Sequence, residues 1–119
     1  MPNKPILCLD FDGVVHSYTS GWKGAAVIPD PPVPGVWAFI RAAQEFFTVA
    51  IFSSRTNQEG GLEAMKDYVA LNSEMGFHDP IVGLEWPLEK PAAFVTIDDR
   101  ALTFDGTWPA IEVLKAFKP

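Results

Sequence analysis

Three short apolar runs alternate along the chain with segments whose apolar residues recur at helical spacing. The runs are Ile6–Leu9, Thr48–Phe52 and Phe94–Ile97, and each ends at a polar cluster, which is typical of a buried strand that stops at a turn. Residues 36–47 and 59–74 carry apolar positions three or four residues apart, which predicts a helix in each segment. The pattern therefore predicts strands that alternate with helices.

The remaining segments have a different composition. Residues 16–34 are rich in Gly and Pro, which predicts a loop or small hairpin that forms a flap. Short strands are expected at 81–82 and 102–104, and Thr107 can cap a last helix. The buried side of that helix would consist of Ile111, Leu114 and Phe117.

Strands that alternate with helices indicate an α/β fold with a parallel sheet. We expect a doubly wound, Rossmann-like sheet in a three-layer α/β/α arrangement. The 119 residues suit a single domain, 1–119, with residues 16–34 as its flap. In such a sheet, ligands lie beyond the carboxyl ends of the strands, where the strand order reverses. If the first strand is central, the polar clusters that follow all three strands converge there.

Two carboxylates follow the first apolar run directly. Asp10 and Asp12 come after Ile6–Leu9, and burying such groups costs several kcal/mol unless something compensates their charge. A bound cation is the simplest compensation, and Gly13 allows the sharp turn that lets both side chains face one pocket. This motif predicts a metal-dependent site at the carboxyl end of a central strand.

Composition limits the classes of protein that remain. Apolar residues make up 48 % of the chain, which is enough for a core, but no stretch approaches the roughly 18 residues that span a bilayer. The apolar run before Asp10 is too short for a signal peptide, and the single Cys8 fits a reducing compartment, so we expect a cytoplasmic protein without a membrane partner. The net charge of −6 argues against nucleic acid as a partner, although a small local positive patch remains compatible with it.

Four motifs in order resemble the haloacid dehalogenase-like (HAD) hydrolase superfamily. They are Leu9–Val14 with its Asp-x-Asp, Val49–Ser53 as an apolar strand ending in Ser, Lys90, and Phe94–Asp99 as an apolar strand ending in an acidic pair. The resemblance implies a HAD-like fold and a phosphatase that forms an aspartyl-phosphate. Neither gap between the motifs can hold a folded cap domain, so a small capless member is expected.

The resemblance also implies roles for individual residues. Asp10 would be the nucleophile and Asp12 the general acid and base, which suits an oxygen leaving group and hence a phosphomonoester. Ser53 would hydrogen-bond a phosphoryl oxygen, and Lys90 would balance charge around Asp10. The cofactor would be Mg²⁺, because its preferred ligands are oxygen atoms. The metal ligands would be Asp10, the backbone carbonyl of Asp12, Asp98 and Asp99, with Asp99 closer than Asp98.

Several alternatives remain open at this level. Ser54 competes with Ser53 for the phosphoryl contact, and Arg55 and Arg100 are either substrate-phosphate ligands or partners in surface ion pairs. Lys90 follows Glu89 and could pair with it in solvent instead. His16 in the flap either contacts substrate or packs within the flap.

The substrate is equally open. Ser53-Ser54-Arg55 and Asp98-Asp99-Arg100 look similar to motifs of the phosphatase domain of polynucleotide kinase, which points to a nucleotide or polynucleotide 3′-phosphate. Otherwise the substrate is a phosphorylated molecule of unknown size. Capless members of the family often use a neighbouring subunit as a lid, which is compatible with a homo-oligomer. The other functions considered are a noncatalytic metal- or phosphate-binding regulatory domain and a phosphotransferase of the same fold.

Overall fold

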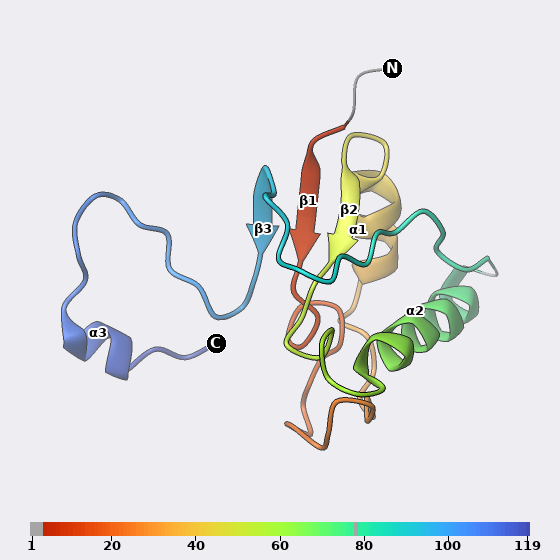
Figure 1. Ribbon diagram of the computed structural model, residues 1–119, viewed down its shortest axis with the longest axis horizontal. Helices are drawn as coiled ribbons and strands as arrows, with labels where there is room; N and C mark the ends of the chain where they lie inside the picture. Colours follow the sequence, from red (N-terminus) through yellow and green to blue (C-terminus); the bar gives the residue numbers. More distant parts are fainter. Residues whose placement is uncertain (1–3, 78) are drawn as a thin grey trace.

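A parallel sheet of three strands forms the centre of the fold (Figure 1). The computed structural model describes residues 4–77 and 79–119. Strand β1 (Ile6–Leu9) lies between β2 (Thr48–Ile51) and β3 (Val95–Ile97), with Cys8 opposite both Ala50 and Thr96. The three strands predicted from the apolar runs, and the central position of the first one, are therefore confirmed. All three strands run in the same direction, so their carboxyl ends lie at one edge of the sheet.

Two helices pack beside this sheet. Helix α1 (Val36–Ala43) buries Val36, Trp37, Ile40 and Ala43, and helix α2 (Gly61–Phe77) buries Met65, Tyr68 and Val69. These side chains form one apolar core with Leu7 and Leu9 of β1 and Val49 and Ile51 of β2. Both predicted helices are confirmed, although α1 ends four residues earlier than the periodicity indicated. The α/β class with a parallel sheet is thus established.

The sheet is open on the side of β3. Val95, Thr96 and Ile97 are all exposed although neighbouring side chains of a strand face opposite sides of a sheet, so neither face is covered along β3. The expected three-layer α/β/α arrangement is therefore not formed along β3. Within the described ranges, residues 81–82 and 102–104 belong to no strand, contrary to prediction. Instead, Glu85 forms an isolated parallel bridge with Ala50.

The last predicted helix is wrong in its cap and in its packing. Helix α3 (Ile111–Lys115) begins after Ala110 instead of near Thr107, and every one of its residues is exposed. The chain leaves the sheet after β3 and runs away from it, so α3 does not pack against the sheet (Figure 1). Residues 101–119 are called the C-terminal arm below.

The segment 16–34 is a flap beyond the carboxyl ends of the strands (Figure 1). Backbone hydrogen bonds close its base, from Ser17 N–H to the Pro31 carbonyl and from Val33 N–H to the Val15 carbonyl. Tyr68 of α2 donates a hydrogen bond to the Asp30 carbonyl at 2.9 Å, which fastens the flap to the body. Among the described residues, no helix has the length and apolar character needed to cross a membrane.

Candidate active site

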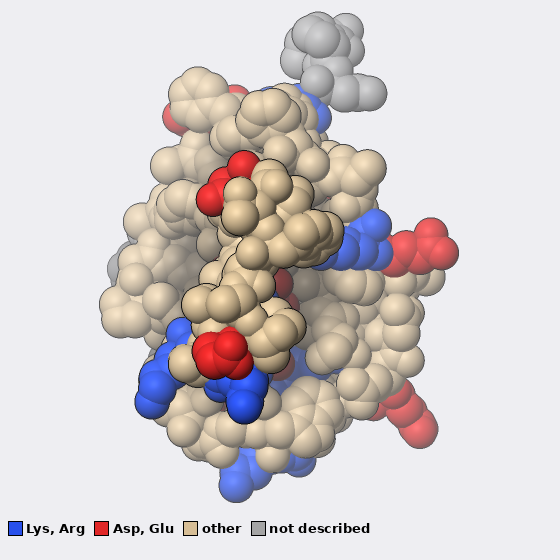
Figure 2. All heavy atoms as spheres, turned by 90° about the vertical axis from the view of Figure 1, so that its left-hand side faces the viewer, with Lys and Arg blue, Asp and Glu red and all other residues tan. Residues whose placement is uncertain are grey.

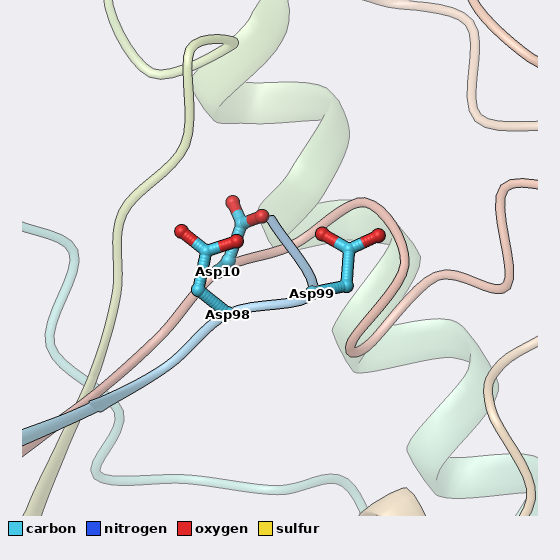
Figure 3. Close-up of side chains that lie close together, drawn as sticks. All are labelled: Asp10, Asp98 and Asp99. Atoms are coloured by element: carbon cyan, nitrogen blue, oxygen red, sulfur yellow. The ribbon is translucent and has the colours of Figure 1, made fainter. Parts of the chain in front are cut away.

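Three carboxylates meet where the central and edge strands end. Asp10 follows β1, and Asp98 and Asp99 follow β3, and one oxygen from each lies within 4.8 Å of the others. Figure 3 shows the three side chains directed to the same side of the backbone. Parallel pairing of β1 with β3 causes this convergence, because it aligns Leu9 with Ile97 and so brings the residues after them together.

Gly13 makes room for one of these carboxylates. Its φ is +83°, in the region that favours glycine, and a Cβ at this position would overlap the side chain of Asp99. The turn after Asp12 therefore has two reasons to contain glycine, its backbone conformation and its close approach to Asp99.

The carboxylate cluster is electrostatically unfavourable by itself. Burial raises the pKa of Asp10 from its ordinary 3.8 to about 6, and the charges of Asp98, Asp99 and Asp12 act in the same direction. Among the described residues, Oδ1 of Asp99 is buried without a hydrogen-bond partner. Several acceptor oxygens thus face each other with little to compensate them, which is the situation that a bound cation relieves.

Asp12 faces a different set of partners. Its Oδ2 accepts a hydrogen bond from Nε of Arg55 at 2.9 Å, and its Oδ1 accepts one from Nδ1 of His16, also at 2.9 Å. The side chain is not part of the cluster formed by Asp10, Asp98 and Asp99. Metal binding at Asp12 was expected through its backbone carbonyl, which leaves the carboxylate free for these two bonds.

His16 is a neutral hydrogen-bond donor in this network. Its Nε2 accepts the backbone N–H of Asp30 at 3.0 Å, so the ring proton lies on Nδ1 and is donated to Asp12. The ring is fully buried and packs against the aromatic rings of Phe11, Tyr18 and Tyr68. His16 was expected either to contact substrate or to pack within the flap. The structure shows the packing, together with a hydrogen bond to Asp12.

Arg55 joins Asp12 to the flap. Its side chain is fully buried, and Nη1 donates hydrogen bonds to the carbonyls of Gly24, Ala25 and Val27 at 2.8 to 3.1 Å. The guanidinium also lies over the ring of Trp22, 4.7 Å from its centroid. Arg55 was expected to bind substrate or a surface partner. The prediction of a surface ion pair is wrong, because the Arg55 side chain is buried. Its observed partners are Asp12 and the flap.

A small hollow of about 200 Å³ lies beside Asp10. Ser53 and Ser54, which follow β2, line it together with Lys90, Cys8 and Asp98. Ser53 is buried and its Oγ accepts the backbone N–H of Arg55, whereas Ser54 is exposed. Both serines border the hollow, so the choice between them stays open.

Lys90 and Arg100 approach the acidic cluster from two sides. Lys90 is exposed but borders the hollow with Asp10, and its charge lowers the pKa of the nearby Cys8 thiol against the dominant effect of burial, which raises it. Arg100 has a side chain that is 60 % exposed, with Nε 3.9 Å from Oδ1 of Asp99. Its backbone N–H donates to Oδ1 of Asp98 at 2.9 Å. Two cations therefore flank a site that is otherwise acidic.

Two residues of the network were missed by sequence reasoning. Asp30 positions His16 through its backbone, and the pKa of its carboxyl is held below the ordinary value by hydrogen bonds from Ser20. Tyr68 holds the same part of the flap through its hydroxyl. Only the spacing of four between Asp12 and His16 could have suggested part of this arrangement.

Comparisons with known proteins add no further information about this site. No family model, no curated protein and no solved structure matches the chain.

Proposed function

We propose that this chain is a Mg²⁺-dependent phosphomonoester hydrolase of the capless HAD-like type, with an aspartyl-phosphate intermediate on Asp10. The observation that supports this most is the meeting of Asp10, Asp98 and Asp99 within 4.8 Å, at the edge of a hollow that Lys90 and two serines also line. Such a group of oxygen ligands beside a lysine suits both a divalent cation and a phosphoryl group.

The donor set fits Mg²⁺. All three side chains offer carboxylate oxygens, and Oδ1 of Asp99 is buried without a hydrogen-bond partner among the described residues. Asp10, Asp98 and Asp99 would hold the ion, with the Asp12 carbonyl as a further ligand. When bound, Mg²⁺ supplies positive charge that offsets the repulsion between carboxylates and phosphate and stabilises charge in the transition state.

Asp10 is the nucleophile in this proposal. One of its oxygens attacks phosphorus while the bond from phosphorus to the leaving oxygen breaks, and that oxygen takes a proton from Asp12. Water then attacks the phosphorus of the aspartyl-phosphate and gives a proton to Asp12, while the bond from phosphorus to Asp10 breaks. Inorganic phosphate leaves, and both carboxyl groups return to their starting states.

Asp12 must move for the first of these steps. Both of its oxygens accept hydrogen bonds here, from Arg55 and His16, which suits its role as a base toward water. To protonate a leaving group, the carboxylate gives up one of these bonds, takes a proton from solvent water and turns toward Asp10; the hydrolytic water returns that proton to it in the second step. Arg55 and His16 are therefore positioning residues, which hold Asp12 between its two tasks.

The size of the hollow is consistent with binding of the phosphoryl group alone. Its volume of about 200 Å³ is below the roughly 300–1,000 Å³ of pockets that enclose a whole small molecule. Ser53 or Ser54 would donate to a phosphoryl oxygen, and Lys90 would neutralise charge beside Asp10. The leaving group would remain outside, near Arg100, where a nucleotide or a larger phosphorylated molecule has room.

A noncatalytic metal- or phosphate-binding domain is the second candidate. The observation that favours it is the engagement of both Asp12 oxygens, since a domain that only binds has no use for a mobile acid. A phosphotransferase would use the same residues, with an alcohol in place of water as the acceptor.

Hydrolysis of p-nitrophenyl phosphate by the full chain, with Mg²⁺ and with EDTA, distinguishes these functions. We expect turnover that requires Mg²⁺ and that Asp10→Asn abolishes. Asp67→Asn is a matched control, because Asp67 is an exposed carboxylate on α2 outside the site.

Each alternative function predicts a different result in these assays. Mg²⁺ binding without turnover on a panel of nucleotides, sugar phosphates and 3′-phosphorylated oligonucleotides would replace the hydrolase with the binding domain. Transfer of phosphate to added alcohol in preference to water would identify a phosphotransferase. Full activity of Asp10→Asn would remove Asp10 from the mechanism.

A further inference from the structure

The chain exposes more surface than a folded monomer of its size. Its solvent-accessible area is 7767 Å², whereas a monomer of 13.1 kDa is expected to expose about 6,400 Å². Its radius of gyration is 15.2 Å, against about 13.5 Å expected for this length. The difference of about 1,400 Å² exceeds the roughly 800 Å² that each partner buries in a stable interface.

The C-terminal arm accounts for this extended shape. It leaves the carboxyl end of β3 and leads away from the sheet (Figure 1). Seen from that side, the arm lies in front of the body, and its surface is largely uncharged between a few charged side chains (Figure 2). Its exposed large apolar residues are Leu102, Phe104, Trp108, Ile111, Val113 and Leu114.

These side chains form a concave apolar surface on the arm. Phe104 and Trp108 contact each other with ring centroids 4.7 Å apart, and Gly106 between them has a φ of +99°, which allows the chain to turn. Together with Leu102, Ile111 and Leu114 they line a hollow of about 800 Å³. Such a hollow can accept an apolar side chain.

The edge of the sheet offers a complementary surface. Phe94 is 76 % exposed, and Val95 and Ile97 of β3 are exposed as well. As the outer strand, β3 also has one edge without a neighbouring strand in the part of the chain that the structure describes. Exposed apolar edge strands are surfaces on which a second chain commonly docks.

We propose that the C-terminal arm packs against β3 of a second copy of this chain, and that the two copies exchange their arms in a symmetric dimer. Phe94 of each copy then occupies the apolar hollow of the other copy's arm. Each copy contributes both an arm and a β3 surface. A twofold axis therefore forms the same contact twice and gives a closed dimer.

The charges on the arm favour a second copy as the occupant. Asp105, Glu112, Lys115 and Lys118 balance to zero, whereas the whole chain has a net charge of −6. The arm therefore carries no charge that would select a strongly basic or acidic partner, and it can approach another acidic copy without net repulsion. This inference does not depend on the proposed hydrolase function.

The mass of the full chain in solution, measured by light scattering after gel filtration, tests the dimer. We expect twice 13.1 kDa at high concentration and a fall toward the monomer on dilution. Phe104→Ser/Trp108→Ser is expected to weaken self-association about tenfold or more. Leu71→Ser is the control. Leu71 is also an exposed large apolar residue, but it lies on α2, so this variant is expected to keep the dimer. A monomer at every concentration, or a dimer unaffected by the double substitution, would overturn the proposal.

Crosslinking between different variants separates exchange from an arm that folds back. Chains with Phe94→Cys are mixed with chains with Trp108→Cys and treated with a short bismaleimide; the wild type is the control for the native Cys8, which is buried. A covalent dimer of the two different variants supports exchange even if the serine variant fails to fold. A chain that carries both Phe94→Cys and Trp108→Cys is treated in the same way. If it links only within itself, and the mixed single variants form no covalent dimer, the arm folds back and the proposal is wrong.

Discussion

Nε of Arg55 donates a hydrogen bond of 2.9 Å to Oδ2 of Asp12, a residue 43 positions earlier in the chain. The same guanidinium donates to three backbone carbonyls of the flap through Nη1. A single buried side chain therefore connects the end of β2, the turn after β1 and the flap. The Arg55 guanidinium therefore holds both the Asp12 carboxylate and the backbone of the flap in place.

Arg55→Lys tests this connection. A lysine ammonium cannot reproduce the fork of donors, so Asp12 and the flap carbonyls cannot all keep their partners. We expect the free energy of unfolding in urea to fall by about 3 kcal/mol and the 20–30 segment to become sensitive to protease.

Arg100→Lys is the control for this substitution. Its side chain is 60 % exposed, so the change is expected to leave the free energy of unfolding within about 0.5 kcal/mol. Equal stability of the two variants would show that the buried contacts of Arg55 are not significant.

Gly13→Ala tests the close approach of the turn to Asp99. A Cβ would overlap the Asp99 carboxylate and would also strain a backbone with φ of +83°. We expect a loss of about 2 kcal/mol in the free energy of unfolding and at least a tenfold weaker affinity for Mg²⁺, measured by calorimetric titration.

Gly21→Ala separates the two causes. Gly21 has a φ of +75°, but among the described residues no atom lies within 4 Å of the place of its Cβ. This variant should show the backbone strain alone, about 1 kcal/mol, with Mg²⁺ affinity unchanged. Loss of Mg²⁺ affinity in both variants would mean that contact with Asp99 is not the cause.

Asp10 should make the metal-free protein less stable as the pH rises. Its pKa is about 6 in the folded state and 3.8 ordinarily, so the folded state binds more protons between these values. The free energy of unfolding therefore falls from pH 3.8 to about 6 and is not recovered above it.

Replacing this carboxylate removes that loss. Asp10→Asn should be more stable than the wild type by about 1 kcal/mol at neutral pH in EDTA, a figure reduced from the full shift because the group is partly screened by solvent. Thermal unfolding at several pH values measures the effect. If Asp10→Asn were less stable than the wild type under these conditions, the ionised Asp10 carboxylate would not destabilise the metal-free protein.

Asp98 and Asp99 should contribute unequally to Mg²⁺ affinity. Oδ1 of Asp98 already accepts the backbone N–H of Arg100, whereas Oδ1 of Asp99 is buried without a hydrogen-bond partner among the described residues. We expect Asp99→Asn to weaken Mg²⁺ binding about a hundredfold and Asp98→Asn about tenfold. Titration of each variant measures both values, and the reverse order would exchange the roles of the two residues.

Asp12→Asn should slow poor leaving groups more than good ones. An alkyl oxygen needs a proton to leave, whereas p-nitrophenolate leaves without one. We expect kcat to fall about 10³-fold for an alkyl phosphate and about tenfold for p-nitrophenyl phosphate. Equal losses on both substrates would contradict a role as general acid.

The three strands of the sheet, the two helices between them and the meeting of the acidic residues could be predicted from the sequence. Continuous apolar runs such as Ile6–Leu9 specify buried strands by themselves, and helices between them require the strands to be parallel. Parallel strands end at one edge of the sheet, so Asp10 and the 98–99 pair were bound to approach once β1 was central. A short-range pattern and a general rule of topology were sufficient to determine these features.

What the tertiary structure alone decided were the partners of side chains distant in sequence. The bonds from Arg55 and His16 to Asp12 depend on how the flap closes over the strand ends, and no periodic pattern contains that information. The exposure of α3 had the same origin: Ile111 and Leu114 have the spacing of a buried face, but burial requires a surface within reach, and the arm leads away from the sheet. Sequence determined which residues are apolar, charged or able to turn, and the path of the chain determined which of them meet.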